Sequence, residues 1–232
     1  MTTDITLLEQ EIMSDIDERE ELMSRIRLMY VRYGFSERDE QLFLNYSIPI
    51  VYSIWEGFVQ TSFQIYIRAL NKELTRLELN IDSVCEPILV YHMESTFRQF
   101  KQYPNPKSDE DKPKIVKKKV DFFNALGLFY KSNTLQIHPD ISTESNVGFN
   151  VLNRILNDFN LQKIPEYPEP EYSLKLELHT LLDTRNKVAH GQKSSIVVKR
   201  EDLERAINLV KKLMPLVFER IKTGFIEKSY LK

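Results

Sequence analysis

The sequence predicts an all-α fold, an up-and-down bundle of helices, from three observations. Long stretches carry apolar residues at the three- and four-residue intervals of a helix. Within the stretch 37–74, residues 48–67 are apolar almost all the way round, as in the central helix of a bundle. Proline and glycine gather between these stretches. With 232 residues, 42% of them hydrophobic and 28% charged, the chain can bury a substantial core.

The first half of the chain contains three predicted helices. Residues 1–33 hold an extra N-terminal helix, acidic in its first half and arginine-bearing in its second, an order that suits the helix dipole. The second helix spans about 37–74, and Pro49 is expected to kink or split it. The third runs from about 82 to 103, with Asp82 or its neighbour as the cap.

The second half contains the remaining helices and an irregular region. Residues 104–171 are expected to form a linker and an insert on the bundle, because prolines are dense and apolar residues few. Helices are expected within it at 112–129 and 146–159. Residues 172–232 hold the motif helix and a final helix. We therefore expect a single domain over 1–232.

Charge and cysteine content exclude several classes of function. The formal net charge of −2 gives no global attraction to nucleic acid, so a polyanion site must be a local patch. The lone Cys85 excludes an intrachain disulfide, and no Cys/His cluster has the spacing of a zinc site. Residues 1–10 do not resemble a signal peptide, and no apolar run approaches the roughly 20 residues of a membrane span. We expect a cytoplasmic protein without membrane insertion, metal or cofactor.

The chemistry of the chain is concentrated at 183–191, where a cation, an amide and an imidazole close an apolar helical run. At about 100° per residue, Arg185 falls on the stripe of Leu181, whereas Asn186 and His190 lie on the far face. An arginine on a core stripe is costly unless a carboxylate, a phosphate or a subunit boundary receives it. We therefore expect an anionic partner for this guanidinium.

Glu56 is a second charge in apolar surroundings. It lies in the Trp-Glu-Gly-Phe stretch 55–58, with Tyr52 on its own helix face. A carboxylate in such a place needs a partner, and Arg185 is the one we expect. Gly57 should let another helix approach closely. The alternative is a purely structural pair of Glu56 with another cation or with a tyrosine hydroxyl.

Both charged features of the sequence also have a plainer interpretation. A cation and a histidine in a last helical turn, followed by Gly191, are typical of a well-terminated helix. The lysines at the head of the fourth helix are expected to form a solvated face, with contact to an RNA backbone as the alternative. These lysines are Lys112, Lys114, Lys117, Lys118 and Lys119.

Two stretches together resemble the HEPN superfamily. Arg185-Asn186 followed by His190 is similar to the Arg-Asn-x-x-x-His form of the HEPN motif. The stretch 55–58 resembles the first core helix of the HEPN subfamily named after the cyanobacterial proteins MAE_28990 and MAE_18760. The resemblance covers the second helix and about 172–232, and the middle of the chain only weakly. It implies a HEPN-like up-and-down helical bundle.

The resemblance also implies a metal-independent endoribonuclease of toxin or phage-defence type. Its substrate is RNA, cut by attack of the 2′-hydroxyl at a composite site where two copies of the motif face each other in a homodimer. An imidazole suits proton transfer near neutral pH, and a guanidinium suits a phosphorane-like transition state. We assign His190 as general acid/base, Arg185 as transition-state stabiliser, Asn186 as orienting His190 or phosphate, and Glu56 as holding Arg185. An antitoxin or a defence-system protein is a further expected partner.

Two other functions stay open at this point. One is a non-catalytic HEPN-like module that dimerises or binds a nucleotide or a partner protein, with the polar turn as a hydrogen-bonded lock. The other is a purely structural bundle in which His190 only ends a helix.

Overall fold

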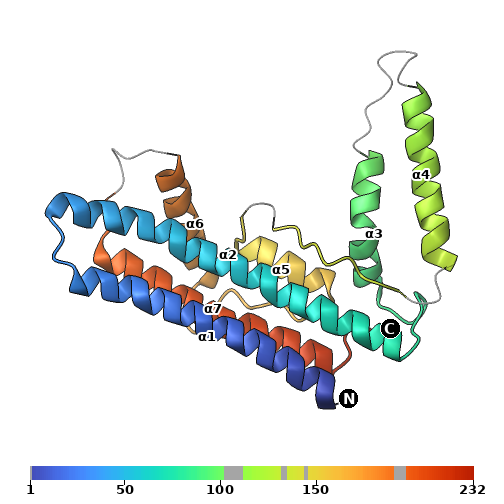
Figure 1. Ribbon diagram of the computed structural model, residues 1–232, viewed down its shortest axis with the longest axis horizontal. Coiled ribbons are helices and arrows are strands. Elements are labelled where there is room, and N and C mark those ends of the chain that lie inside the picture. Colours follow the sequence, from blue (N-terminus) through green and yellow to red (C-terminus); the bar gives the residue numbers. More distant parts are fainter. Residues whose placement is uncertain (1, 102–111, 132–134, 144–145, 191–196) are drawn as a thin grey trace.

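The structure is a computed structural model that describes residues 2–101, 112–131, 135–143, 146–190 and 197–232, with only the backbone described at 2–4, 95–96 and 98–101. Within these residues the regular structure is entirely α-helical apart from two isolated bridges, which confirms the predicted all-α bundle. The helices are α1 (Thr2–Arg32), α2 (Glu37–Arg76), α3 (Glu86–Lys101), α4 (Lys112–Lys131), α5 (Phe149–Asp158), α6 (Leu174–Ala189) and α7 (Arg200–Ile226) (Figure 1).

The central helix is α2, which packs against α1, α6 and α7. Its side chains Trp55, Phe58 and Phe63 are fully buried. The helix runs unbroken through Pro49, so of the kink or split that we expected there, the split does not occur. Burial of α2 by three other helices stabilises it enough to offset the backbone hydrogen bond that proline cannot donate.

Gly57 makes room for a side chain of α1. The Arg19 guanidinium donates to the Ile54 carbonyl (2.9 Å) and to Thr61 Oγ1 (3.3 Å), and its Nε donates to Asp15 (2.7 Å). A Cβ added at Gly57 would stand 3.0 Å from Nη1 of Arg19. A neighbouring helix does come close at Gly57, as we expected, and it does so through this guanidinium.

The third helix begins later than its sequence indicates, at Glu86. The preceding backbone is paired with the last residues of the chain instead. The Cys85 N–H donates to the Tyr230 carbonyl (2.9 Å), and the Lys232 N–H donates to the Ser83 carbonyl (3.1 Å). The Ser83 carbonyl and the Cys85 N–H thus pair with the end of the chain before α3 begins.

The expected insert is better packed than its sparse apolar content indicates. Its segments are part of the same hydrophobic core as α2 and α7. The helices α3 and α4 project away from the bundle (Figure 1). The buried apolar side chains of the segment are Leu135, Ile137, Val147, Leu152, Ile155, Leu156, Phe159, Leu161 and Ile164.

His92 joins the two projecting helices. Its ring stacks on Phe129 of α4, with ring centroids 5.5 Å apart. Burial, assisted by the nearby His138, lowers the pKa of His92 below its ordinary value of 6.5. The neutral imidazole is therefore the form that the contact between α3 and α4 favours.

This contact should weaken in acid. Above pH 6.5 the imidazole of His92 is mostly neutral in both the folded and the unfolded chain. Below that pH the unfolded chain becomes protonated at His92 before the folded chain does, so the folded state loses stability as the pH falls. We expect less protection of α4 amides in hydrogen exchange at pH 5.5 than at pH 7.5, after correction for intrinsic exchange. The His92→Phe variant, which keeps an aromatic ring on Phe129, should lose less protection. An equal loss in the variant would contradict this assignment.

Candidate active site on the motif helix

The motif helix α6 begins and ends on local signals. The Ser173 Oγ caps its start and accepts a hydrogen bond from the Leu176 N–H (3.2 Å). Leu181 belongs to the buried stripe that fixes the rotation of the helix. The last helical bond runs from the His190 N–H to the Asn186 carbonyl (2.9 Å). The imidazole thus stands at the C-terminal end of α6.

Arg185 and His190 lie on different sides of α6. Arg185 is half-buried, and its guanidinium carbon lies 4.9 Å from the centre of the Tyr52 ring on α2. His190 is exposed, and its imidazole makes no hydrogen bond to the residues that the structure describes. The arginine therefore points inward and the histidine outward, as helical geometry predicts. Gly191, expected to end the helix, lies outside the described residues.

The Arg185 guanidinium is held along one edge by neutral groups. Its Nη1 donates to Asn186 Oδ1 (2.7 Å) and, more weakly, to Asn146 Oδ1 (3.4 Å). No carboxylate forms an ion pair with it in the described part of the chain, so the expected anionic partner is absent there. Its Nε and Nη2 make no hydrogen bond to described residues and are not sealed from solvent. These donors are free to bind an anion.

The expected ion pair between Glu56 and Arg185 is not formed. Glu56 accepts a hydrogen bond from Thr143 Oγ1 (3.1 Å) instead, and Gln60 Nε2 donates to the same threonine oxygen (3.4 Å). The reason is the Tyr52 ring, one turn before Glu56, which occupies the place beneath the guanidinium. Glu56 and Arg185 are both near Tyr52 and influence its ionisation, but they do not bond to each other.

Two side chains of α2 clamp the backbone beside this site. The Val147 N–H donates to the Tyr52 hydroxyl oxygen (2.7 Å), and the Trp55 indole N–H donates to the Val147 carbonyl (2.9 Å). Burial raises the pKa of Tyr52 to about 12, and the nearby Glu56 carboxylate adds to the shift, so the hydroxyl stays neutral at physiological pH. The clamp fixes the position of Asn146, the residue directly before Val147.

A cavity of about 680 Å³ lies beside the site. Asn146 lines it, so the cavity adjoins the hydrogen-bonding partners of Arg185. His179 and Lys175 of α6 contribute polar groups, and Tyr167 contributes an exposed ring. By helical spacing His179 shares a face of α6 with Asn186. The polar face of the motif helix therefore continues into a space of the size that small ligands occupy.

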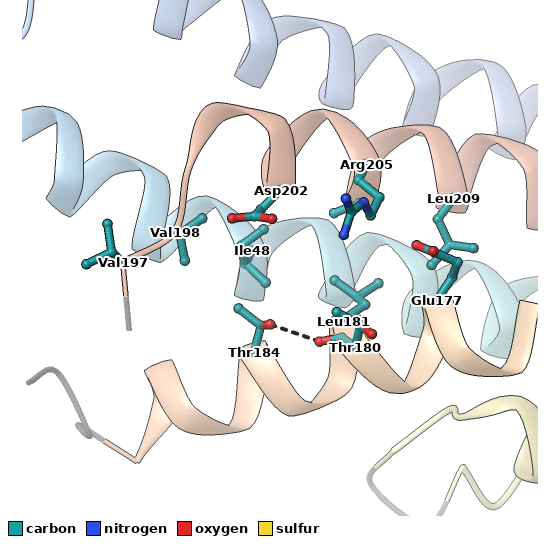
Figure 2. A pocket seen from close by; sticks show the side chains of 11 residues that line it. Ile48, Glu177, Thr180, Leu181, Thr184, Val197, Val198, Asp202, Arg205 and Leu209 are labelled. Atoms are coloured by element: carbon teal, nitrogen blue, oxygen red, sulfur yellow. Dashed lines mark hydrogen bonds between the residues drawn. The ribbon is translucent and has the colours of Figure 1, made fainter. Parts of the chain in front are cut away.

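A smaller cavity, of about 150 Å³, lies between α6 and α7. Figure 2 shows Thr180 and Thr184 of α6 opposite Asp202 and Arg205 of α7, with a hydrogen bond from the Thr184 hydroxyl to the Thr180 carbonyl (2.9 Å). None of the motif residues lines this cavity. It belongs to the packing of the two helices.

Sequence reasoning identified only part of this arrangement. It placed Tyr52 on the face of Glu56, but did not assign it to Arg185. Asn146 and Val147 gave no signal, because they lie in an irregular segment far from the motif in sequence. The lysine-rich helix α4 lies at the opposite end of the molecule from α6 (Figure 1), so one protomer does not bring its lysines beside His190.

Within the described ranges, no three His, Cys, Asp or Glu side chains are grouped closely enough to hold a metal ion. No helix in those ranges has both the length and the apolar character to cross a membrane.

Comparison with known families gives one match. The sequence model of the MAE_28990-like HEPN family matches residues 8–230. The match includes the middle of the chain, which the motifs by themselves cover weakly. No curated protein and no solved structure matches the chain.

The clamp on Val147 can be tested by removing one oxygen atom. The Tyr52→Phe variant leaves the buried Val147 N–H without its acceptor, which should lower the free energy of unfolding by about 1–3 kcal/mol. Urea denaturation measures the loss. Tyr167→Phe is the control, because that tyrosine is exposed and its change should be within about 0.5 kcal/mol of the parent protein. Equal stability of the two variants would show that the hydroxyl does not hold this segment.

Proposed function

We propose, from the premise that the chain belongs to the MAE_28990-like HEPN family, that it is a metal-independent endoribonuclease of toxin or phage-defence type. HEPN domains are commonly ribonucleases. The observation that carries the proposal for this chain is the state of Arg185. Its guanidinium is held in place without a carboxylate from the described residues, keeps Nε and Nη2 free of hydrogen bonds to those residues, and lies five residues before the exposed His190 on the same helix.

In this proposal the side chains perform the steps of RNA cleavage. The 2′-oxygen attacks the adjacent phosphorus, its proton leaves, and the departing 5′-oxygen takes up a proton, giving 2′,3′-cyclic phosphate and 5′-hydroxyl ends. Arg185 Nε and Nη2 stabilise the charge on the non-bridging oxygens. His190 transfers one proton. Asn186 keeps the guanidinium oriented through their 2.7 Å hydrogen bond. Glu56 acts only as a positioning residue, through Thr143 and beside Tyr52.

A homodimer supplies the second proton transfer. One imidazole cannot accept and donate a proton at the same moment, whereas two copies of His190 facing each other can divide these tasks. The exposure of His190 and the uncompensated charge of the half-buried Arg185 support this arrangement, because a second copy with bound RNA would cover both.

The cavity beside α6 also supports a second candidate function. A non-catalytic HEPN-like module would use Arg185 to hold the phosphate of a nucleotide and the 680 Å³ cavity to hold its base. Binding of a nucleotide with no cleavage of RNA, unchanged in His190→Ala, would favour this module over the nuclease.

If the protein is this nuclease, substitutions in the motif should remove RNA cleavage. Purified protein incubated with RNA in EDTA should release fragments with 2′,3′-cyclic phosphate ends, and RNA carrying a 2′-deoxy nucleotide at the cut should resist. His190→Ala and Arg185→Lys should each lower the single-turnover rate by about 100-fold or more. His138→Ala is the control, since its exposed imidazole lies in a loop that packs on α3. Full activity in both motif variants, with unchanged circular dichroism, would contradict the assignment.

The composite site predicts complementation between two inactive proteins. Arg185→Ala and His190→Ala variants, mixed and allowed to exchange subunits, should recover part of the cleavage rate that each lacks alone, because a mixed dimer holds one Arg185 and one His190 at the shared site, where the single imidazole performs one proton transfer and water performs the other more slowly. Native mass spectrometry, with one variant labelled with heavy isotopes, confirms that mixed dimers form. Mixed dimers with no recovered activity would argue for a site contained within one protomer.

A further inference from the structure

The helix α4 has two apolar faces, and only one of them is covered. None of its side chains is buried. The inner face packs on α3, where Phe122 lies 6.4 Å from Phe97 and Phe129 lies 5.5 Å from His92 between ring centroids. Among the described helices, α3 is the one that α4 packs against. The opposite face of α4 is left to solvent.

The uncovered face is a regular apolar seam, which we call the outer seam. Its members alternate at intervals of four and three residues, as the contact positions of a coiled coil do. A Cβ added at Gly127 would have no atom within 4 Å beyond its own stretch of helix, so no other described part of the protein covers the face at this position. The seam consists of Val116 (59% exposed), Val120 (50%), Phe123 (64%), Gly127 and Tyr130 (67%).

Lysines border the outer seam on both sides. At about 100° per residue, Lys119 lies along one border and Lys117 and Lys131 along the other. All three are exposed, and none of them forms an ion pair with a described residue. The sequence of α4 contains six lysines against a single acidic residue, Asp121. The apolar seam therefore lies in a strongly positive field.

We propose that the outer seam binds an amphipathic helix of a partner protein. The bound helix carries apolar residues at the same alternating spacing and Glu or Asp beside them, so that its acidic flanks meet the lysines of α4. From Val116 to Tyr130 the seam is about 21 Å long, which suits a partner helix of four turns. The projection of α3 and α4 from the bundle leaves space for such a helix (Figure 1).

Other occupants fit the outer seam less well. A second copy of α4 would place lysines against lysines. A membrane-surface helix needs a broad apolar face, whereas this stripe covers only about 80° of the circumference. An RNA strand would contact the lysines through its phosphates, but would leave the apolar side chains of Val116 and Val120 exposed to solvent. Among these occupants, an acidic amphipathic helix best fits a narrow aliphatic and aromatic stripe that is bordered by lysines.

A designed peptide provides the probe. It is a labelled amphipathic helix with leucines at alternating three- and four-residue spacing and glutamates beside them, titrated against the full chain by fluorescence anisotropy. We expect it to bind at least tenfold more tightly than a matched peptide with lysines beside the same leucines, and more weakly as salt rises. Phe123→Asp should weaken binding at least tenfold. Leu128→Asp, the same kind of change at an exposed position off the outer seam, should not.

Several results would overturn the proposal. They are failure of the glutamate peptide to bind, equal binding of the two peptides, and equal loss in Phe123→Asp and Leu128→Asp when both variants keep their helical circular dichroism. Single-stranded RNA and vesicles containing anionic phospholipid are tested in parallel. Displacement of the peptide by either of them, with binding that Phe123→Asp abolishes, would assign the seam to nucleic acid or to membrane. None of these outcomes depends on ribonuclease activity, so the test is independent of the proposed function.

Discussion

The candidate site depends on two hydrogen bonds that α2 makes to one residue outside it. The Tyr52 hydroxyl accepts from the Val147 N–H, and the Trp55 indole donates to the Val147 carbonyl. All three residues are buried, so these hydrogen bonds lie in a region of low dielectric constant. There a hydrogen bond is strong, and a polar group left without one costs free energy. They fix an irregular segment against the central helix, and so place Asn146 beside Arg185.

Among the described residues, the partners of Arg185 are neutral groups that support its charge without neutralising it. A ring face contributes about 0.5–2 kcal/mol to a cation placed over it, and amide oxygens add charge-assisted hydrogen bonds without removing the charge. A carboxylate in the same place, such as the Glu56 pair that we expected, would satisfy the guanidinium in the resting protein. Because no described carboxylate takes that place, the guanidinium keeps its charge for an anion, which is what the proposed role of Arg185 requires.

The motif helix α6 and the projecting helices α3 and α4 form separate parts of the molecule. The motif helix is backed by the bundle, where α2 and α7 hold a continuous core. The projecting helices α3 and α4 have few buried side chains, and the stacking of His92 on Phe129 is one of their main contacts. Regions with little buried apolar area open at lower free energy than the core. A partner bound to α4, or a change of pH, can thus act on this region without unfolding the bundle.

The sequence by itself determined what depends on neighbours along one helix. Periodicity located the helices, and the angular step of a helix put Arg185 inward and His190 outward. Tertiary structure decided the rest: that α2 passes through Pro49, and that Glu56 pairs with Thr143 and not with Arg185. Both outcomes depend on residues that lie far apart in the chain. Only the packed fold fixes which of these residues come within hydrogen-bonding distance of each other, and therefore which interactions form.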